Sequence, residues 1–333
     1  MGKLVPATMM TQHPDSASRY VSVRDEPMEA IDALTPQPIG LGMEEVMVDY
    51  EGKLTPYHQT AEITLGLLER GLVCGRDVMV TPRVPSATKE TAFHQLMALM
   101  SVIESNYQLQ SSESGGAISE VIVPMVESAD ELIAVRRRIE DVIELGHKEF
   151  GISRDPAAVQ AIPLIEEVPE LLSAGRMMAE YIEKAEPAGY AVGRLRIMLG
   201  RSDSAMIYGM LPSVLAVKVA ISDCLAMGAA KDIETLPIFG GGVLPFRGHA
   251  SLDNLDNLLA DFAGIRTITG QSGLRYDCGS EVARQFAIRA KELLEAGRKP
   301  LSYSEEERAE LVSLIGIFTR FYLESFAELI EVV

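Results

Sequence analysis

Eight short, nearly continuous apolar runs recur along the chain, and each is followed by a polar turn and then by a longer segment of helical period. The runs end at residues 8–13, 46–50, 78–83, 121–125, 162–166, 197–201, 236–240 and 266–270. Runs that are apolar at most positions, rather than at alternate ones, are typical of parallel strands covered on both faces. The pattern therefore predicts eight buried parallel strands.

Helical spacing of apolar residues predicts connecting helices at 57–71, 87–107, 129–148, 168–185, 208–228, 252–262 and 280–297. Eight strand-helix units in one chain of 333 residues favour a (β/α)8 barrel of the TIM type, an α/β fold, over an open sheet. We expect a single barrel domain over 1–333, with its strands within 4–277 and a flexible loop at 111–116. An additional C-terminal helix is expected from Ser304, because the three glutamates that follow favour a helix N-terminus.

The amino-acid composition limits which molecules the protein is expected to bind. The net charge of -18, without a block of Lys or Arg, argues against nucleic acid and against anionic membranes. No apolar stretch is expected to reach membrane-spanning length, and the three widely spaced cysteines fit neither a disulfide framework nor a zinc site. We therefore expect a soluble cytoplasmic protein whose cysteines are reduced.

Polar residues follow the apolar runs, at the end of the barrel where such folds place their active sites. These residues are His13, Asp49, Arg83, Glu127, Glu166, Asp203, Arg247 and Arg275. Glu166 and Asp203 end separate strands, and two carboxylates without nearby cysteines or paired histidines favour Mg²⁺ or Mn²⁺ over zinc. Capping of the following helix is the alternative reading for either acid alone.

Three arginines lie in turns that contain Gly or Pro, rather than on a helix face where a solvated arginine normally lies: Arg83, Arg247 and Arg275. Their guanidinium groups are suited to holding carboxylates or phosphates. The glycine-rich turn 239–248 would let backbone approach an anion closely, although such a run is also simply a flexible turn. His13 lies in a polar turn after the first strand, where a structural role is the alternative.

Several of these segments together resemble one enzyme family. They are residues 11–19, 46–59, 81–87, 163–166, 200–204, 244–248 and 271–277. Their order, and their spread over nearly the whole chain, are similar to those of archaeal-type phosphoenolpyruvate carboxylase. The resemblance implies a homo-oligomeric barrel enzyme, a tetramer in the family, that joins phosphoenolpyruvate and bicarbonate with Mg²⁺ to give oxaloacetate and phosphate.

The resemblance also implies roles for individual residues. His13 matches the histidine that handles a carboxyphosphate intermediate, and Glu166 and Asp203 match the metal ligands. Arg247 matches the catalytic arginine after the glycine turn, while Arg83 and Arg275 look similar to arginines that hold the substrate's phosphate and carboxylate. Gln271 and Arg201 complete the expected substrate-binding set, Arg201 because Met206 stands where longer bacterial and plant enzymes carry a lysine.

Family members of this type continue beyond the point equivalent to Val333, so the sequence is expected to be a fragment or a shortened lineage. Two other functions stay open. One is a different Mg²⁺-dependent lyase or aldolase acting on pyruvate-like enolates, and the other is a non-catalytic binding subunit. The apolar positions of the C-terminal helix, including Phe318, Tyr322 and Phe326, further predict self-association and weak activity.

Overall fold

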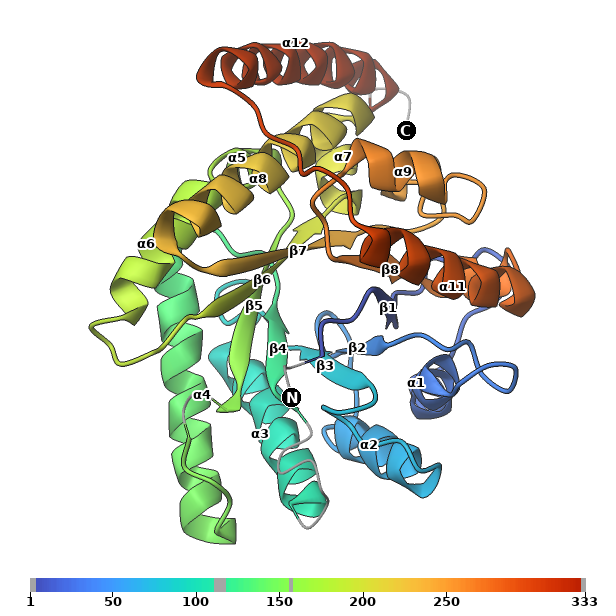
Figure 1. Ribbon diagram of the computed structural model, residues 1–333, viewed down its shortest axis with the longest axis vertical. Helices are drawn as coiled ribbons and strands as arrows, with labels where there is room; N and C mark the ends of the chain where they lie inside the picture. Colours follow the sequence, from blue (N-terminus) through green and yellow to red (C-terminus); the bar gives the residue numbers. More distant parts are fainter. Residues whose placement is uncertain (1–3, 111–117, 156–157, 331–333) are drawn as a thin grey trace.

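The computed structural model describes residues 4–110, 118–155 and 158–330, and it contains a closed barrel of eight parallel strands (Figure 1). The strands are β1 (Thr8–Thr11), β2 (Glu45–Asp49), β3 (Met79–Arg83), β4 (Glu120–Val123), β5 (Gln160–Ile165), β6 (Arg194–Gly200), β7 (Glu234–Gly240) and β8 (Thr267–Gly270). Each strand pairs with the next in the sequence, and β1 closes the barrel by pairing with β8. The predicted TIM-type barrel is confirmed. The loop expected at 111–116 lies outside the described residues.

Helices surround the barrel on its outer side (Figure 1). They are α1 (Glu26–Leu34), α2 (Gln59–Glu69), α3 (Ala92–Leu109), α4 (Ala129–Phe150), α5 (Val168–Leu172), α6 (Ala174–Ala185), α7 (Ser202–Tyr208), α8 (Met210–Lys231), α9 (Leu255–Asp261), α10 (Ser272–Tyr276), α11 (Ser280–Ala296) and α12 (Glu305–Ile330). A 3-10 turn, η2 (Pro245–Arg247), follows β7.

The helices differ from the sequence-based expectation in several places, and α10 is among those not predicted. The nine residues of α1 were not predicted, because their buried face is short and relies partly on alanines. The predicted helix 168–185 is divided at Ser173 into α5 and α6. Gly209 separates α7 from α8 with a φ of 97°, and a Cβ there would lie 2.9 Å from Cγ of Tyr322 on α12. Packing against α12 therefore requires glycine at this break.

The inside of the barrel is filled by side chains and is not a pore. Its central layer is an apolar cluster formed by Met9, Met47, Ile122, Ile162, Leu164, Met198 and Ile238. Alternation along the strands points these side chains inward, while their neighbours pack against the surrounding helices. The layer closes the barrel beneath its C-terminal end, where a cavity opens.

Below this layer lies a buried ionic group contributed by alternate strands. The guanidinium of Arg196 on β6 donates to both carboxylate oxygens of Glu45 on β2, at 2.9 and 2.6 Å, and to Glu120 on β4 at 2.8 Å. It also donates to Thr267 on β8 at 3.3 Å. The side chains of Arg196 and Glu45 are 2% and 0% exposed. The sequence analysis did not identify this group, because its members are far apart in the chain.

We expect Glu45→Ala to lower the free energy of unfolding by about 3 kcal/mol, since it removes the bidentate partner of a buried guanidinium. Urea denaturation followed by circular dichroism measures this loss. The triple variant Glu45→Met, Arg196→Met and Glu120→Gln should recover most of it, because apolar side chains can replace a buried ion pair when no charged partner is left behind. A loss as large in the triple variant as in Glu45→Ala would contradict this explanation.

Helix α8 corrects one expectation about membranes. It spans 22 residues with a mean hydropathy of 1.6 in its most apolar window, so by length and composition it is able to cross a membrane. However, 56% of that window is buried in the barrel structure, where α8 packs against α5, α6, α7, β7 and α12. A helix covered on several sides is apolar around most of its circumference. The apolar length of α8 is therefore explained by its position in the core.

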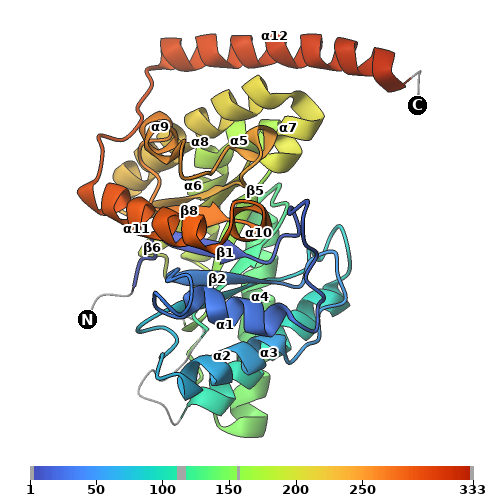
Figure 2. The same cartoon turned by 90° about the vertical axis from the view of Figure 1, so that its right-hand side faces the viewer.

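Helix α12 lies outside the ring of helices, across α7 and α8 (Figure 2). Its predicted start is confirmed by a capping box, in which Ser304 N donates to the Glu307 carboxylate at 2.8 Å and Glu307 N donates to Ser304 Oγ at 3.2 Å. Tyr322 Oη donates to the carbonyl of Met206 at 2.6 Å and ties the helix to α7. Other apolar side chains of α12, including Phe318 and Phe326, stay exposed.

Candidate active site

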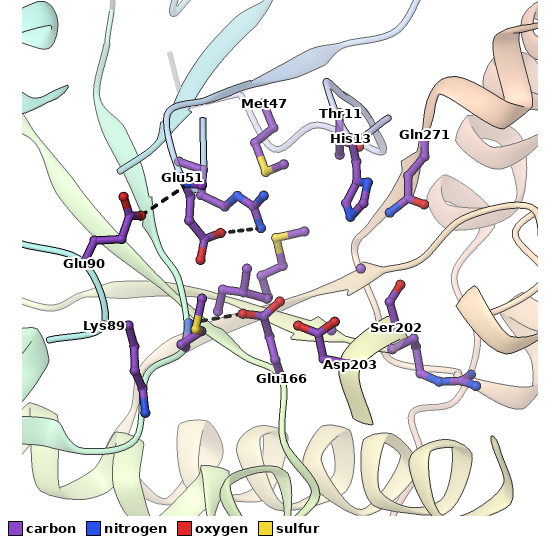
Figure 3. Close-up of a pocket in the computed structure, with 18 residues that line it drawn as sticks. Thr11, His13, Met47, Glu51, Lys89, Glu90, Glu166, Ser202, Asp203 and Gln271 are labelled. Carbon is purple, nitrogen blue, oxygen red and sulfur yellow. Dashed lines mark hydrogen bonds and ion pairs between the residues drawn. The ribbon is translucent and has the colours of Figure 1, made fainter. Parts of the chain in front are cut away.

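A cavity of about 400 Å³ opens at the C-terminal end of the barrel, above the apolar layer (Figure 3). All eight strands, or the loops that directly follow them, contribute to its lining. The contributing residues include Thr11, Met47, Arg83, Met125, Glu166, Gly200, Gly240 and Gln271. Met47, Leu164 and Met198 form an apolar floor, and charged side chains stand around it. This is the end of the barrel at which the sequence places the candidate residues.

Glu166 and Asp203 lie close together in this cavity, as predicted from the ends of β5 and β6 (Figure 3). Burial is the main cause that raises the pKa of Glu166 to about 8, and the charges of Asp203 and Glu51 add to it. The backbone N–H of Met125 donates to Glu166 Oε2 at 3.2 Å. A Cβ at Gly200 would lie 2.9 Å from Cγ of Glu166, so this glycine leaves room for the carboxylate.

These contacts fit a divalent cation. Two neighbouring carboxylates in a buried site repel each other, and a cation between them would remove the repulsion that raises the pKa of Glu166. No group of three or more His, Cys, Asp or Glu side chains within residues 4–110, 118–155 and 158–330 is arranged to hold a metal ion. Mg²⁺ commonly takes one or two carboxylates and completes its shell with water and substrate oxygens. Oxygen ligation by two acids is therefore the chemistry this site offers.

Arg83 is held by two carboxylates on neighbouring segments. Its Nε and Nη2 donate to the two oxygens of Asp49 at 2.8 and 2.9 Å, and Nη1 contacts Glu51 at 2.8 Å. Burial opposes the charged form of the guanidinium, but these two carboxylates outweigh it and raise the pKa of Arg83. Asp49 thus orients the predicted anion-binding arginine from the end of the adjacent strand.

The turn that carries His13 is fastened to the loop after β8. Asp15 accepts hydrogen bonds from Gly273 N at 2.7 Å and from Ser272 Oγ at 3.0 Å. Asp277 accepts from Ser16 Oγ at 2.7 Å and from Ser18 N at 3.0 Å, among other donors of this turn. These contacts join segments more than 250 residues apart and hold His13 at the cavity.

His13 lines the cavity, and Arg247, which is not among the lining residues, contacts the histidine from the η2 turn. Arg247 Nη1 lies 3.4 Å from His13 Nε2 and donates to Ser202 Oγ at 3.2 Å. Because an arginine N–H can only donate, Nε2 is the acceptor and the neutral ring carries its proton on Nδ1. Burial, followed by the charges of Arg247 and Arg83, lowers the pKa of His13. The imidazole is therefore neutral at pH 7 and able to accept a proton.

We expect Arg247→Gln to raise the pKa of His13, because Arg247 is, after burial, the largest cause that lowers it and has a larger effect than Arg83. Nuclear magnetic resonance titration of the five histidines, with His13 assigned from a His13→Asn sample, measures this shift. Arg289→Gln is the matched control, since Arg289 pairs with Asp256 on the outer surface. An unchanged His13 titration in Arg247→Gln would show that the two side chains do not interact in solution.

The remaining predicted residues are placed differently. Gln271 lines the cavity, and its Oε1 is buried without a hydrogen-bond partner among the described residues. Arg201 borders the cavity, but its Nε donates to Ser213 Oγ at 2.9 Å, and burial lowers its pKa to about 10. The guanidinium of Arg275 bonds the Glu29 carbonyl and the Asp32 carboxylate on α1, and Arg275 is not among the residues that line the cavity. Its role in substrate binding stays a prediction.

Five polar residues of the cavity were not identified from the sequence: Thr11, Glu51, Lys89, Glu90 and Ser202. Glu51 lies two residues beyond β2, in the segment that carries Asp49. Its position shortly after a strand end was the sequence feature that could have identified it. Lys89 forms an exposed ion pair with Glu127 at 2.5 Å. Burial, as the largest cause, raises the pKa of Glu51 to about 7.

Comparison with known proteins places this barrel in a family. The sequence profile of phosphoenolpyruvate carboxylase matches residues 5–333. The chain belongs to the phosphoenolpyruvate carboxylase family. Proteins named phosphoenolpyruvate carboxylase from Methanosarcina mazei and Methanosarcina acetivorans are 42% and 43% identical over 95% and 96% of the chain. That of Methanopyrus kandleri is 40% identical over 97% of the chain, and the resemblance to the archaeal type is confirmed.

The chain spans 59–60% of the length of these three phosphoenolpyruvate carboxylases. Among solved structures, a malate synthase from Haloferax volcanii aligns with 93% of this chain and 80% of its own, with a TM-score of 0.53 and 14% identity. That likeness concerns the fold alone.

Proposed function

We propose that this chain forms the catalytic barrel of a phosphoenolpyruvate carboxylase, which converts phosphoenolpyruvate and bicarbonate into oxaloacetate and phosphate. Family membership supports the substrates, and the cavity at the C-terminal end of the barrel supports the chemistry. The observation that carries the proposal is the convergence of Glu166, Asp203 and His13 on one cavity whose floor is apolar.

Glu166 and Asp203 are proposed to hold one Mg²⁺ or Mn²⁺, and a divalent ion bound there would stabilise negative charge on the substrate's phosphate and on the enolate. Arg83 and Arg247 would neutralise the remaining charge of the phosphate and carboxylate, so that the bicarbonate anion can approach phosphorus. Gln271 would contribute a polar contact through its buried amide oxygen. Arg201, which borders the cavity and is held by Ser213, would add a further positive charge for the substrate.

His13 is proposed to handle a proton. When a bicarbonate oxygen attacks phosphorus, the bond from phosphorus to the enolate oxygen breaks and carboxyphosphate forms. The bicarbonate proton must then move to the departing phosphate while CO₂ is released and joins C3 of the enolate. A neutral His13 is suited to accept and return that proton, because its lowered pKa keeps it unprotonated at pH 7. The apolar floor limits water that would otherwise protonate the enolate.

The proposal is tested by incubating the purified chain with phosphoenolpyruvate, bicarbonate and Mg²⁺ while measuring phosphate and oxaloacetate. A carboxylase releases both in equal amounts, and only when bicarbonate is present. Bicarbonate-independent cleavage would favour a different enolate lyase or aldolase. Binding of phosphoenolpyruvate without either product would favour a non-catalytic binding subunit.

We further propose a homo-oligomer that acts in the cytoplasm, with no nucleic-acid or membrane partner. The negative net charge supports the last part. The exposed apolar side chains Phe318, Phe321 and Phe326 of α12 support self-association. Light scattering at micromolar concentration tests the assembly, and a monomer would contradict it.

A further inference from the structure

Each nitrogen of the Arg83 guanidinium is already bonded to a carboxylate that belongs to the protein. Asp49, on the adjacent strand, accepts hydrogen bonds from Nε and Nη2 of the guanidinium and orients it. The remaining nitrogen, Nη1, contacts the Glu51 carboxylate at 2.8 Å. The proposed function needs this same nitrogen for the phosphate or carboxylate of the substrate, so two anions would compete for one donor.

We propose that Glu51 is an internal competitor for the anion site of Arg83, which a phosphate- or carboxylate-bearing ligand must displace in order to bind. Glu51 would thereby set the affinity of the cavity for anions and exclude ligands that carry no anionic group. This inference rests on the proposed function only for the identity of the natural ligand, because the competition itself concerns any anion of this class.

The surroundings of Glu51 allow its side chain to leave. Its backbone lies two residues after Asp49, and two residues further on Lys53 Nζ bonds Glu26 at 2.6 Å and fixes the segment. Between these anchors Gly52 has a φ of 66°, and a Cβ built there would meet no atom within 4 Å. The side chain of Glu51 also borders the open cavity. Displacement therefore needs rotation of one side chain and no rearrangement of the strands.

The position of Glu51 is also poorly suited to a permanent carboxylate. Its Oε1 is buried and has no hydrogen-bond partner among the described residues. Burial, the largest cause, and the nearby carboxylates raise its pKa to about 7 despite the contact with Arg83. Asp49 differs, because both of its oxygens are bonded by Arg83. A ligand with several acceptor oxygens could therefore replace Glu51 at Nη1, and the protein would lose only a carboxylate contact in which one oxygen has no partner in the described part of the chain.

The experiment measures binding of inorganic phosphate, which is not turned over, by isothermal titration calorimetry of the whole chain. Glu51→Ala should bind phosphate about tenfold more tightly than the unmodified protein, since a charge-assisted hydrogen bond no longer has to be broken first. Glu51→Gln should lie between the two, because its amide oxygen still accepts from Arg83 without a charge. Circular dichroism verifies that each variant is folded.

Three further variants locate the effect. Glu90→Gln removes another carboxylate that lines the same cavity, and its amide oxygen can still accept from Gly52 N, now at 3.3 Å. Its phosphate affinity should stay within about twofold, because a neighbouring charge without a direct contact contributes little. Arg83→Gln, alone and combined with Glu51→Ala, should bind phosphate equally weakly, since the contested donor is absent from both.

The inference is overturned if folded Glu51→Ala binds phosphate no more tightly than the unmodified protein, including the case in which neither binds. It is also overturned if the gain persists in the Arg83→Gln background. The outcome is separate from the proposed function. A tighter Glu51→Ala variant in a protein that makes no oxaloacetate would leave the competition intact and refute the carboxylase assignment.

Discussion

Glu166→Gln and Asp203→Asn are each expected to weaken Mg²⁺ binding by more than about tenfold, and to lower oxaloacetate formation by about 10³-fold. Each substitution replaces the carboxylate of a proposed metal ligand by a neutral amide of similar size, so the barrel should stay folded. Replacing Glu166 also removes the carboxylate whose pKa is raised to about 8 by burial and neighbouring acids. Calorimetric titration with Mg²⁺ measures the first effect without relying on activity.

Glu127→Gln is the matched control for this prediction. Glu127 also follows a strand and pairs with Lys89, but its side chain is 46% exposed. Its substitution should leave Mg²⁺ affinity within about twofold. Undiminished metal affinity in both Glu166→Gln and Asp203→Asn would refute the metal site, whatever happens to activity.

His13→Asn is expected to reduce oxaloacetate formation by about 10³-fold while bicarbonate-dependent release of phosphate from phosphoenolpyruvate continues. The reason is that His13 is proposed to act after phosphoryl transfer, when carboxyphosphate must be held until CO₂ and the enolate meet. Pyruvate should then replace oxaloacetate as the organic product. Coupled assays for phosphate, pyruvate and oxaloacetate measure this change of product directly.

His249→Asn provides the corresponding control. His249 follows the glycine-rich turn and has a φ of 54°, a conformation that asparagine also tolerates. Its substitution should leave the ratio of products unchanged. If His13→Asn loses all phosphate release while still binding phosphoenolpyruvate, the histidine serves the first step and the assigned role is wrong.

The strands could be predicted from the sequence because each is a short apolar run with a polar residue directly after it. Glu166 and Asp203 could be predicted for the same reason, since residues that directly follow a barrel strand lie at the end of the barrel that carries the active site. Helix α1 escaped prediction because its nine residues bury two alanines on a short face. In that case tertiary packing, rather than periodicity, determines the helix.

The side-chain partners could not be predicted in the same way. Arg275 follows β8 much as Arg83 ends β3, yet its guanidinium bonds Glu29 and Asp32 on α1, a helix that was itself not foreseen. Glu51 was missed although it does line the cavity. Nothing in the local sequence indicates that it contacts Arg83, which is 32 positions away. Sequence position identifies the end of the barrel, whereas the direction of a long side chain depends on neighbours from other strands.

The fastening of the His13 turn has a consequence for how the protein matures during synthesis. The contacts that tie Asp15, Ser16 and Ser18 to the rest of the barrel are made with residues 272–277, and β1 finds its second neighbour in β8. Contacts of such long sequence separation form late, since the entropy of closing the intervening chain must be overcome first. A nascent chain that has not yet emerged past Asp277 therefore cannot hold the histidine in place. The carboxylate pair and the histidine would be assembled at different times, and no partly synthesised barrel would present both.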